Sequence, residues 1–217
     1  MRRKSGIAAI VAVLAWSGPA AAHPHIFIDA GFTLIRDAGG QFSAIEVRWR
    51  YDELYSLILL EDYGLDPDFD LVLTEAETEA TLGFDLNWSG GFTGGLVVTQ
   101  DGAEVGLGPP EPVSLTLLPS GRIETIHRRP LIDVASAPLS VSIHDPEFYI
   151  AFEMILPAAV AGAPECSAEL VRADLDRAYA ILEAALDEIG GAVAAEDNFP
   201  PVGAHFADRV EVTCPAS

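Results

Sequence analysis

Two alternating segments near the start of the chain constrain its fold most strongly. Every second residue is apolar between residues 26 and 34, and the same alternation returns between residues 45 and 51. Successive side chains of a strand point to opposite faces, so each segment predicts a strand with one buried face. The intervening Asp37-Ala38-Gly39-Gly40 has the composition of a turn, and the whole predicts an antiparallel hairpin.

The rest of the chain alternates between strand and helix patterns. Glycine and proline separate further strand-like segments, which we expect at about 95–101, 113–118, 122–128, 139–144, 148–155 and 208–214. Residues 52–63 and 74–87 predict two helices around an acidic loop, and residues 167–189 predict a long amphipathic helix that Ser167 caps and Gly190-Gly191 ends. The predicted class is α+β: sandwich-like antiparallel β-sheets, an inserted helix–loop–helix at about 52–88 and a C-terminal amphipathic helix.

The first 22 residues have the composition of a secretory signal peptide. Residues 2–4 are basic, residues 6–18 form an apolar core too short to span a bilayer, and residues 20–22 are alanines that suit signal peptidase. We expect cleavage after Ala22, which leaves one periplasmic domain, residues 23–217, without membrane insertion of its own. An uncleaved membrane anchor is the alternative.

Acidic residues dominate the remaining chain. The full sequence carries 33 acidic and 12 basic residues, for a net charge of −21, and no lysine follows residue 4. A surface of this charge repels phosphate groups, so we expect neither nucleic acid nor anionic lipid as a partner. The acidity by itself indicates solubility and does not indicate a metal site.

Cys166 and Cys214 are the two cysteines of the chain. Because an exported protein enters an oxidising compartment, we expect them to form a disulfide. The bond would close the chain between residues 166 and 214 into a loop, which adds about 4 kcal/mol to the free energy of unfolding. A site in which both thiolates bind a metal ion is the alternative.

The segment His23-Pro24-His25 predicts a transition-metal site. Cleavage after Ala22 would give His23 a free α-amine, so that this amine and the Nδ1 atom can chelate one metal ion. His25 lies about 6.6 Å further along an extended chain on the same side and can add a third nitrogen. Imidazole nitrogens suit zinc, copper and nickel. A frayed, solvated chain end is the competing interpretation.

Other side chains can complete this coordination. His144 and Asp145 follow a predicted strand, and His205 precedes the last one. His127 is a weaker candidate, because the two arginines that follow it would repel a cation. Each of these histidines also has an ordinary interpretation as a surface or hydrogen-bonded residue.

The acidic segment 66–77 has the spacing of a calcium-binding loop between two helices. Its ligands would be, in order, Asp66, Asp68, Asp70, the carbonyl of Val72, Thr74 and Glu77. Leu71 stands where such a loop needs the positive φ that glycine adopts, at a cost of about 1–2 kcal/mol. The segment therefore predicts a degenerate, structural calcium site. A set of acidic residues that only start a helix is the alternative.

Four spaced motifs resemble one known family over nearly the whole mature chain. They are HPHIF at 23–27, WRYDE at 49–53, DPEFYIAF at 145–152 and FADRVEVTCP at 206–215. The chain resembles a periplasmic family described as a component of ABC-type transport systems, whose members often lie beside, or are fused to, NicO-type nickel/cobalt transporters. The resemblance implies the handling of a transition metal, zinc first and nickel or cobalt next, and it assigns the histidines of the first motif to His23 and His25.

The sequence departs from that family at two positions. His144 replaces the tyrosine of a Tyr-Asp-Pro motif, and Leu71 replaces a glycine that is frequent in the acidic loop of relatives. The first departure adds a candidate ligand, and the second weakens the prediction of calcium binding.

Three hypotheses on function follow. The first is a periplasmic zinc-, nickel- or cobalt-binding protein that serves an inner-membrane NicO-type permease or an ABC transporter. The second is a calcium-stabilised interaction module, and the third is a copper enzyme that uses the His23 chelate. Because the sequence contains no nucleophile elbow, no His-Glu-x-x-His pair, no phosphate loop and no dinucleotide fingerprint, we expect a binding protein rather than an enzyme.

Overall fold

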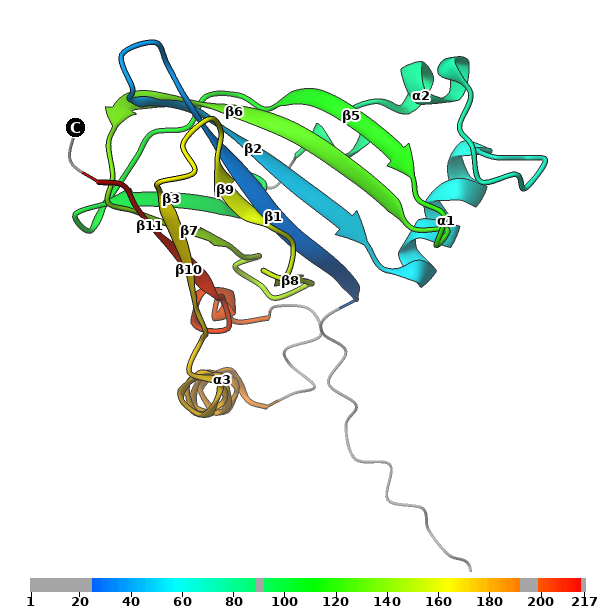
Figure 1. Cartoon of the computed structure of the whole chain (residues 1–217). Helices are drawn as coiled ribbons and strands as arrows, with labels where there is room; N and C mark the ends of the chain where they lie inside the picture. The colour runs from blue at the N-terminus through cyan, green and yellow to red at the C-terminus, as the bar shows by residue number, and fades with distance from the viewer. Residues whose placement is uncertain (1–24, 89–91, 192–198, 216–217) are drawn as a thin grey trace, which may run out of the picture.

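The computed structural model describes residues 25–88, 92–191 and 199–215. Figure 1 shows two β-sheets with a helical insertion at one end of the larger sheet. This six-stranded sheet has the order β5-β6-β2-β1-β8, with β9 also paired to β1. Its strands are β1 (Ile26–Arg36), β2 (Phe42–Tyr51), β5 (Glu111–Leu117), β6 (Ile123–Ala135), β8 (Ile150–Glu153) and β9 (Ala158–Val160).

The second sheet has five strands in the order β10-β11-β7-β3-β4. They are β3 (Leu96–Gln100), β4 (Ala103–Glu104), β7 (Leu139–Ile143), β10 (Ser167–Val171) and β11 (Arg209–Thr213). The two sheets share one hydrophobic core, in which Phe32 and Val47 of the first join Val98, Val141 and Val212 of the second. The predicted α+β class with sandwich-like sheets is confirmed.

The N-terminal hairpin has the predicted pairing. Ala30 lies opposite Trp49 and Phe32 opposite Val47 in the antiparallel β1–β2 ladder, and all four side chains are buried. The other edge of β1 differs from the expectation, because β8 and β9 run parallel to it. The chain returns to this edge after it has passed through β7 of the second sheet, and a long crossover of this kind allows parallel pairing.

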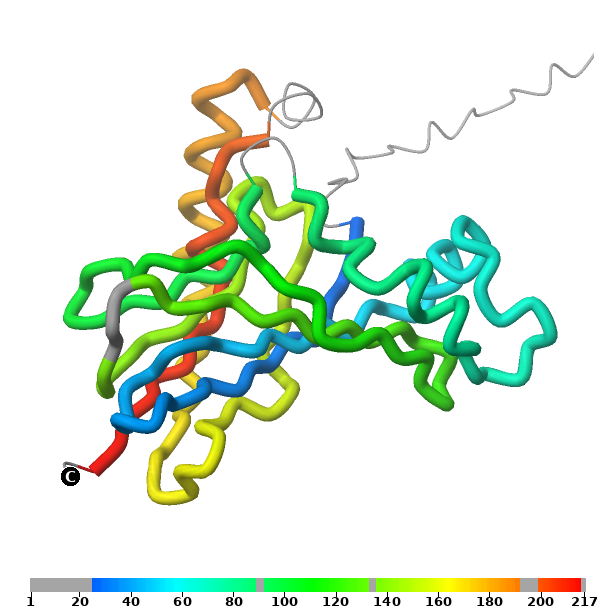
Figure 2. The backbone as a smooth tube through the Cα atoms, turned by 90° about the horizontal axis from the view of Figure 1, so that it is seen from above, coloured from blue at the N-terminus to red at the C-terminus, as the bar shows by residue number. Residues whose placement is uncertain are grey.

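The predicted helix 167–189 is two elements. Residues Ser167–Val171 form β10, which pairs antiparallel with β11, and α3 covers Leu175–Ile189. Asp174 caps the helix in place of Ser167, since its side chain accepts a hydrogen bond from the backbone N of Arg177 at 3.1 Å. Figure 1 shows α3 beyond the end of β10, and Figures 1 and 2 show it far from the helical insertion.

Two predicted features of the C-terminal part are confirmed. Gly190 ends α3 in the left-handed conformation with a φ of 98°, which glycine adopts without steric penalty. Cys166 and Cys214 form the expected disulfide. The bond joins the start of β10 to the end of β11, so α3 and the short helix η3 (Gly203–His205) lie within the loop that it closes.

The helical insertion consists of α1 (Glu53–Tyr63), α2 (Glu75–Thr81) and the single turn η1 (Phe84–Leu86). Asp52 caps α1 by accepting a hydrogen bond from the backbone N of Tyr55 at 2.8 Å. The second helix is shorter than the predicted 74–87, because Gly83 takes a φ of 83° and turns the chain. Within the described ranges, no helix is long and apolar enough to cross a membrane.

Buried contacts fix the insertion to the six-stranded sheet. The Ser56 hydroxyl, fully buried on the inner side of α1, accepts a hydrogen bond from the backbone N of Ile123 at 2.9 Å. The Tyr51 ring at the end of β2 lies 5.4 Å from the Tyr55 ring and 6.1 Å from the Phe84 ring. These contacts hold the acidic loop between α1 and α2 at a defined place beyond the end of the sheet.

Candidate functional site

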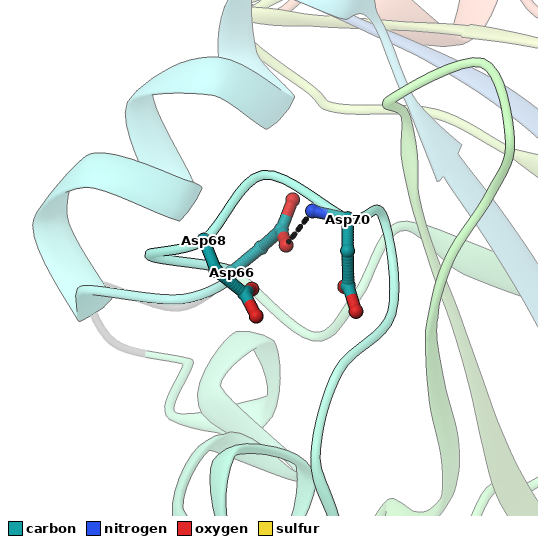
Figure 3. A group of neighbouring side chains, drawn as sticks. All are labelled: Asp66, Asp68 and Asp70. Carbon is teal, nitrogen blue, oxygen red and sulfur yellow. Dashed lines mark hydrogen bonds between the residues drawn. The ribbon is translucent and has the colours of Figure 1, made fainter.

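Three carboxylates gather in the loop between α1 and α2. One oxygen from each of Asp66, Asp68 and Asp70 lies within 4.8 Å of the other two. Figure 3 shows the three side chains on this loop. In the part of the chain that the structure covers, no other group of three or more His, Cys, Asp or Glu side chains meets so closely. The side chain of Asp66 is buried, whereas Asp68 and Asp70 are exposed. The group is therefore open to solvent on one side.

Asp66 organises the backbone of this loop. Its Oδ1 atom accepts hydrogen bonds from the backbone N of Asp70 at 2.9 Å and of Leu71 at 3.2 Å. Leu71 has a φ of 63°, the left-handed conformation that the calcium-loop spacing requires at this position. A leucine there is strained by about 1–2 kcal/mol relative to an ordinary conformation. The two hydrogen bonds to Asp66 offset part of this strain.

Thr74 and Glu77, predicted as the later ligands of the loop, form a capping box at the start of α2. The Oε2 atom of Glu77 accepts hydrogen bonds from the Thr74 backbone N at 2.7 Å and from the Thr74 hydroxyl at 2.6 Å. These hydrogen bonds, that of the hydroxyl first, lower the pKa of Glu77. Its Oε1 atom accepts from the backbone N of Asp66 at 2.9 Å. Glu77 thus closes the loop and is not part of the close carboxylate group.

Val72, whose carbonyl is a predicted ligand, forms a hydrogen bond within the same loop through its backbone N–H. Its N–H donates to the Oδ1 atom of Asp70 at 2.8 Å. Five of the six predicted calcium ligands therefore take part in hydrogen bonds that shape the loop, and Asp68 makes none within the described part of the chain. The assignment of the six residues as ligands stays a prediction.

The predicted transition-metal ligands lie elsewhere. His25 stands just before β1, where its backbone N donates to the Tyr149 carbonyl at 2.8 Å and its ring lies 4.7 Å from the Tyr149 ring. His23, which carries the predicted chelate, lies outside the described residues. His25 is exposed, so its ring is accessible to an ion from solvent.

His144 and Asp145 occupy the turn after β7. The carboxylate of Asp145 is buried and accepts hydrogen bonds from the backbone N of Glu147 at 3.2 Å and of Ile150 at 3.0 Å. The Nδ1 atom of His144 is buried and has no hydrogen-bond partner in the described structure, and burial lowers the pKa of His144. Asp145 thus stabilises its own turn.

The same turn carries η3 and His205. The backbone N of Gly203 donates to the Pro146 carbonyl at 2.9 Å, and a Cβ on Gly203 would collide with the Asp145 carbonyl. The Phe148 and Phe206 rings stack at 4.6 Å. This end of the molecule therefore holds His25, His144 and His205 on neighbouring segments, but among the described residues no three of the predicted transition-metal ligands come within ligand distance of one another.

The chain matches the family described as "Protein of unknown function (DUF1007)" over residues 8–214. It belongs to this family. The match covers both sheets, the helical insertion and both cysteines of this DUF1007 member. No curated protein matches the chain.

His127 of this DUF1007 member, which the sequence predicts only as a weak metal ligand, has a chemically unusual environment. His127 is 1% exposed and neither ring nitrogen has a hydrogen-bond partner in the described structure. Its ring lies 4.7 Å from that of Trp49 and 5.8 Å from that of Trp88. Burial, and second the nearby Arg129, lower the pKa of His127 to about 4. The alternation of β6 could have indicated this, because it places His127 on the same face as the buried Ile123.

Asp85 is a half-buried carboxylate that the sequence did not indicate as a special residue. Asp85 in η1 accepts hydrogen bonds from the Thr125 hydroxyl at 2.6 Å and the Tyr51 hydroxyl at 3.0 Å. Burial raises the pKa of Asp85 against the effect of these two hydrogen bonds. No local sequence signal marks Asp85, since its partners lie in β2 and β6.

Proposed function

We propose that this chain is an exported protein that binds a divalent metal ion, with a calcium site in its acidic loop. The observation that carries the proposal is the approach of one carboxylate oxygen from each of Asp66, Asp68 and Asp70 to within 4.8 Å of the others. Three negative charges at this separation repel one another. A hard divalent cation with oxygen ligands relieves that repulsion, and calcium accepts the irregular geometry that a loop provides.

Calcium takes six to eight oxygen ligands, so three carboxylates are not the whole site. Glu77 is a source of two more oxygens beside the loop, because its Oε1 atom already accepts a hydrogen bond from the backbone N of Asp66. Binding would exchange the hydrogen bonds of Glu77 with Thr74 for bonds to the ion. The proposal therefore includes a rotation of the Glu77 side chain on binding.

Export is the second part of the proposal. A disulfide between Cys166 and Cys214 is typical of proteins in oxidising compartments such as the periplasm. The basic and apolar composition of residues 1–22 supports the same location. Calcium is available there at concentrations that suit a loop weakened by Leu71.

Asp68 offers the sharpest test of the loop. Replacement of Asp68 by Ala removes one charge and one ligand oxygen but none of the loop's hydrogen bonds, so the fold is retained. We expect calcium to raise the Tm of the processed wild-type protein, and the calcium concentration that gives half of this rise should be at least tenfold higher for Asp68→Ala. Asp187→Ala, an exposed position on α3, makes the same change of charge and serves as the control. Equal calcium responses in the three proteins would refute the site.

A second candidate function is transition-metal binding at the chain start, in the service of a NicO-type permease or an ABC transporter. The favouring observation is that His25 is held at the entry of β1 by its backbone hydrogen bond to Tyr149, with its exposed ring beside the Tyr149 ring. A preorganised imidazole next to the predicted amine of His23 suits zinc, nickel, cobalt or copper.

The N-terminal amine separates this candidate from the calcium site. We expect zinc affinity to fall when one glycine precedes His23 or when His25 is replaced by alanine, while the calcium response is unchanged. Asp187→Ala is the control, because this exposed residue of α3 is not a predicted ligand of either metal site. Equal zinc affinity in all four proteins would remove the transition-metal candidate and the transporter partner with it.

A further inference from the structure

The outward side of α1 is an aliphatic surface without a partner among the described residues. Leu54, Leu57 and Ile58 are 69%, 59% and 42% exposed. Positions separated by three and four residues lie side by side on a helix, so the three side chains form one patch. The opposite side of α1 is apolar too, and there Leu59 is buried against the sheet. A helix that is apolar on both sides normally has a partner on both sides.

Carboxylates surround this aliphatic patch. The helical period places Glu53 and Asp62 on its two flanks and Glu61 one turn beyond Leu57. All three acidic residues are exposed. Arg122 is the one basic side chain that approaches them in the described structure, with its Nε atom 4.0 Å from Glu53. The patch is therefore an apolar centre with an acidic border.

The charge of this border selects the occupant. A second copy of the chain would bring the same three carboxylates into opposition, in a protein of net charge −21, and an anionic lipid surface would be repelled in the same way. A basic border around an apolar groove attracts all three carboxylates and covers the three aliphatic side chains. We propose that the outward side of α1 docks, as a helix in a groove, into a partner protein whose apolar groove is lined along its rim by Lys and Arg.

This docking is independent of the acidic loop and of the metal that the protein binds. The patch lies on the helix itself, and none of its three aliphatic residues is a predicted metal ligand. The aliphatic side chains of α1 would fill the apolar groove of the partner and supply most of the binding free energy. The carboxylates orient the helix and accelerate encounter.

The test uses a designed probe with the chemistry of the partner. The probe is a fluorescent amphipathic peptide helix of leucine and lysine, and its counterpart has glutamate in place of lysine. Fluorescence anisotropy measures their binding to the processed full chain. We expect the lysine peptide to bind and the glutamate peptide to fail. The triple variant Leu54→Ser, Leu57→Ser, Ile58→Ser should bind the lysine peptide about tenfold or more weakly.

A matched control separates this surface from general acidity. The double variant Leu175→Ser, Tyr179→Ser removes exposed apolar side chains from α3 at the same net charge, and it should bind like the wild type. A second variant, Glu61→Gln with Asp62→Asn, keeps the aliphatic patch and should weaken binding several-fold at low salt. It keeps the test decisive if the triple variant fails to fold.

Three outcomes would overturn the proposal. The first is equal binding of the lysine peptide by the triple-serine variant and the wild type. The second is binding of the wild type, but not the triple variant, to phosphatidylcholine or phosphatidylglycerol vesicles, which would make the patch a membrane contact. The third is concentration-dependent dimerisation of the wild type that the triple variant lacks, measured by light scattering.

Discussion

The hydroxyl of Tyr51 donates a hydrogen bond to the Oδ2 atom of Asp85 at 3.0 Å. Tyr51 is the last residue of β2, and Asp85 lies in η1 at the end of the helical insertion. The bond therefore joins the six-stranded sheet to the segment that follows the acidic loop. Because burial raises the pKa of both groups, the charged form of Asp85 is held at a cost inside the fold.

Asp85→Asn should change the pH dependence of stability in a defined direction. A carboxyl whose folded-state pKa is raised contributes most stability below its unfolded pKa of about 4 and loses it as pH rises through the folded pKa. The free energy of unfolding of Asp85→Asn, relative to wild type, should therefore increase between pH 4 and pH 7. Urea unfolding at the two pH values measures this. A constant difference between the two proteins would contradict it.

His127→Phe should make the protein more resistant to acid. The folded-state pKa of His127 is about 4, below its unfolded value of about 6.5. Its stabilising contribution is therefore complete above pH 6.5 and is lost as pH falls towards 4, by about 3 kcal/mol at most. Phe is also aromatic and keeps the contact with Trp49. We expect the wild type to lose more unfolding free energy than the variant between pH 7 and pH 4.5, and equal losses would show that His127 does not titrate as described.

The disulfide should account for a large part of the stability. Cys166 and Cys214 are 48 residues apart. Closing a loop of this length lowers the conformational entropy of the unfolded chain and so raises the free energy of unfolding by about 4 kcal/mol. The double variant Cys166→Ser, Cys214→Ser should lower the free energy of unfolding by that order. A reducing agent should produce the same loss in the wild type and no loss in the variant. A loss below about 1 kcal/mol would indicate that β10 and β11 hold together without the bond.

Gly203→Ala tests the packing of η3 on the turn after β7. The new Cβ would collide with the Asp145 carbonyl, so one of the two segments must move, at a cost of about 1–3 kcal/mol. Gly39→Ala is the control, because its Cβ would lie 3.2 Å from the exposed side chain of Asp37 and near no backbone of another segment, so a small shift of that side chain suffices. Chemical unfolding of both variants should show the larger loss for Gly203→Ala. Equal losses would mean that η3 is free to shift.

Several elements were predictable because their signals are local. The alternation of residues 26–34 and 45–51 follows from the two faces of a strand, and Asp37 to Gly40 supplies the turn. The predicted helix 52–63 agrees with α1 to within one residue, and Gly190-Gly191 predicted the end of α3. Each of these signals lies within the element it describes or next to it.

The errors concern segments whose partners are distant in sequence. Residues 167–171 fit the helical pattern of α3, yet they pair with β11 about 40 residues further on. The hydrogen bonds of this strand pairing outweigh the weak local preference of these residues for a helix. β8 was predicted as a strand, but its parallel partner β1 could not be read from its residues. His127 was predicted as a weak metal ligand, with a surface or hydrogen-bonded residue as the ordinary interpretation. The structure instead buries its ring, and neither ring nitrogen has a hydrogen-bond partner among the described residues. Arg129, two residues further along β6, shares the inner face and packs on Trp88.

The sequence by itself determined the hairpin, the α+β class and the acidic spacing of the loop, because each depends on the period or composition of short segments. It also determined the pairing of the two cysteines, because the chain has only these two. Tertiary structure alone decided that Asp66, Asp68 and Asp70 converge while Glu77 closes the loop, that His127 is buried, and that one side of α1 stays uncovered. Burial and convergence depend on which segments pack together in space, and the local sequence of one strand or helix does not specify its tertiary contacts.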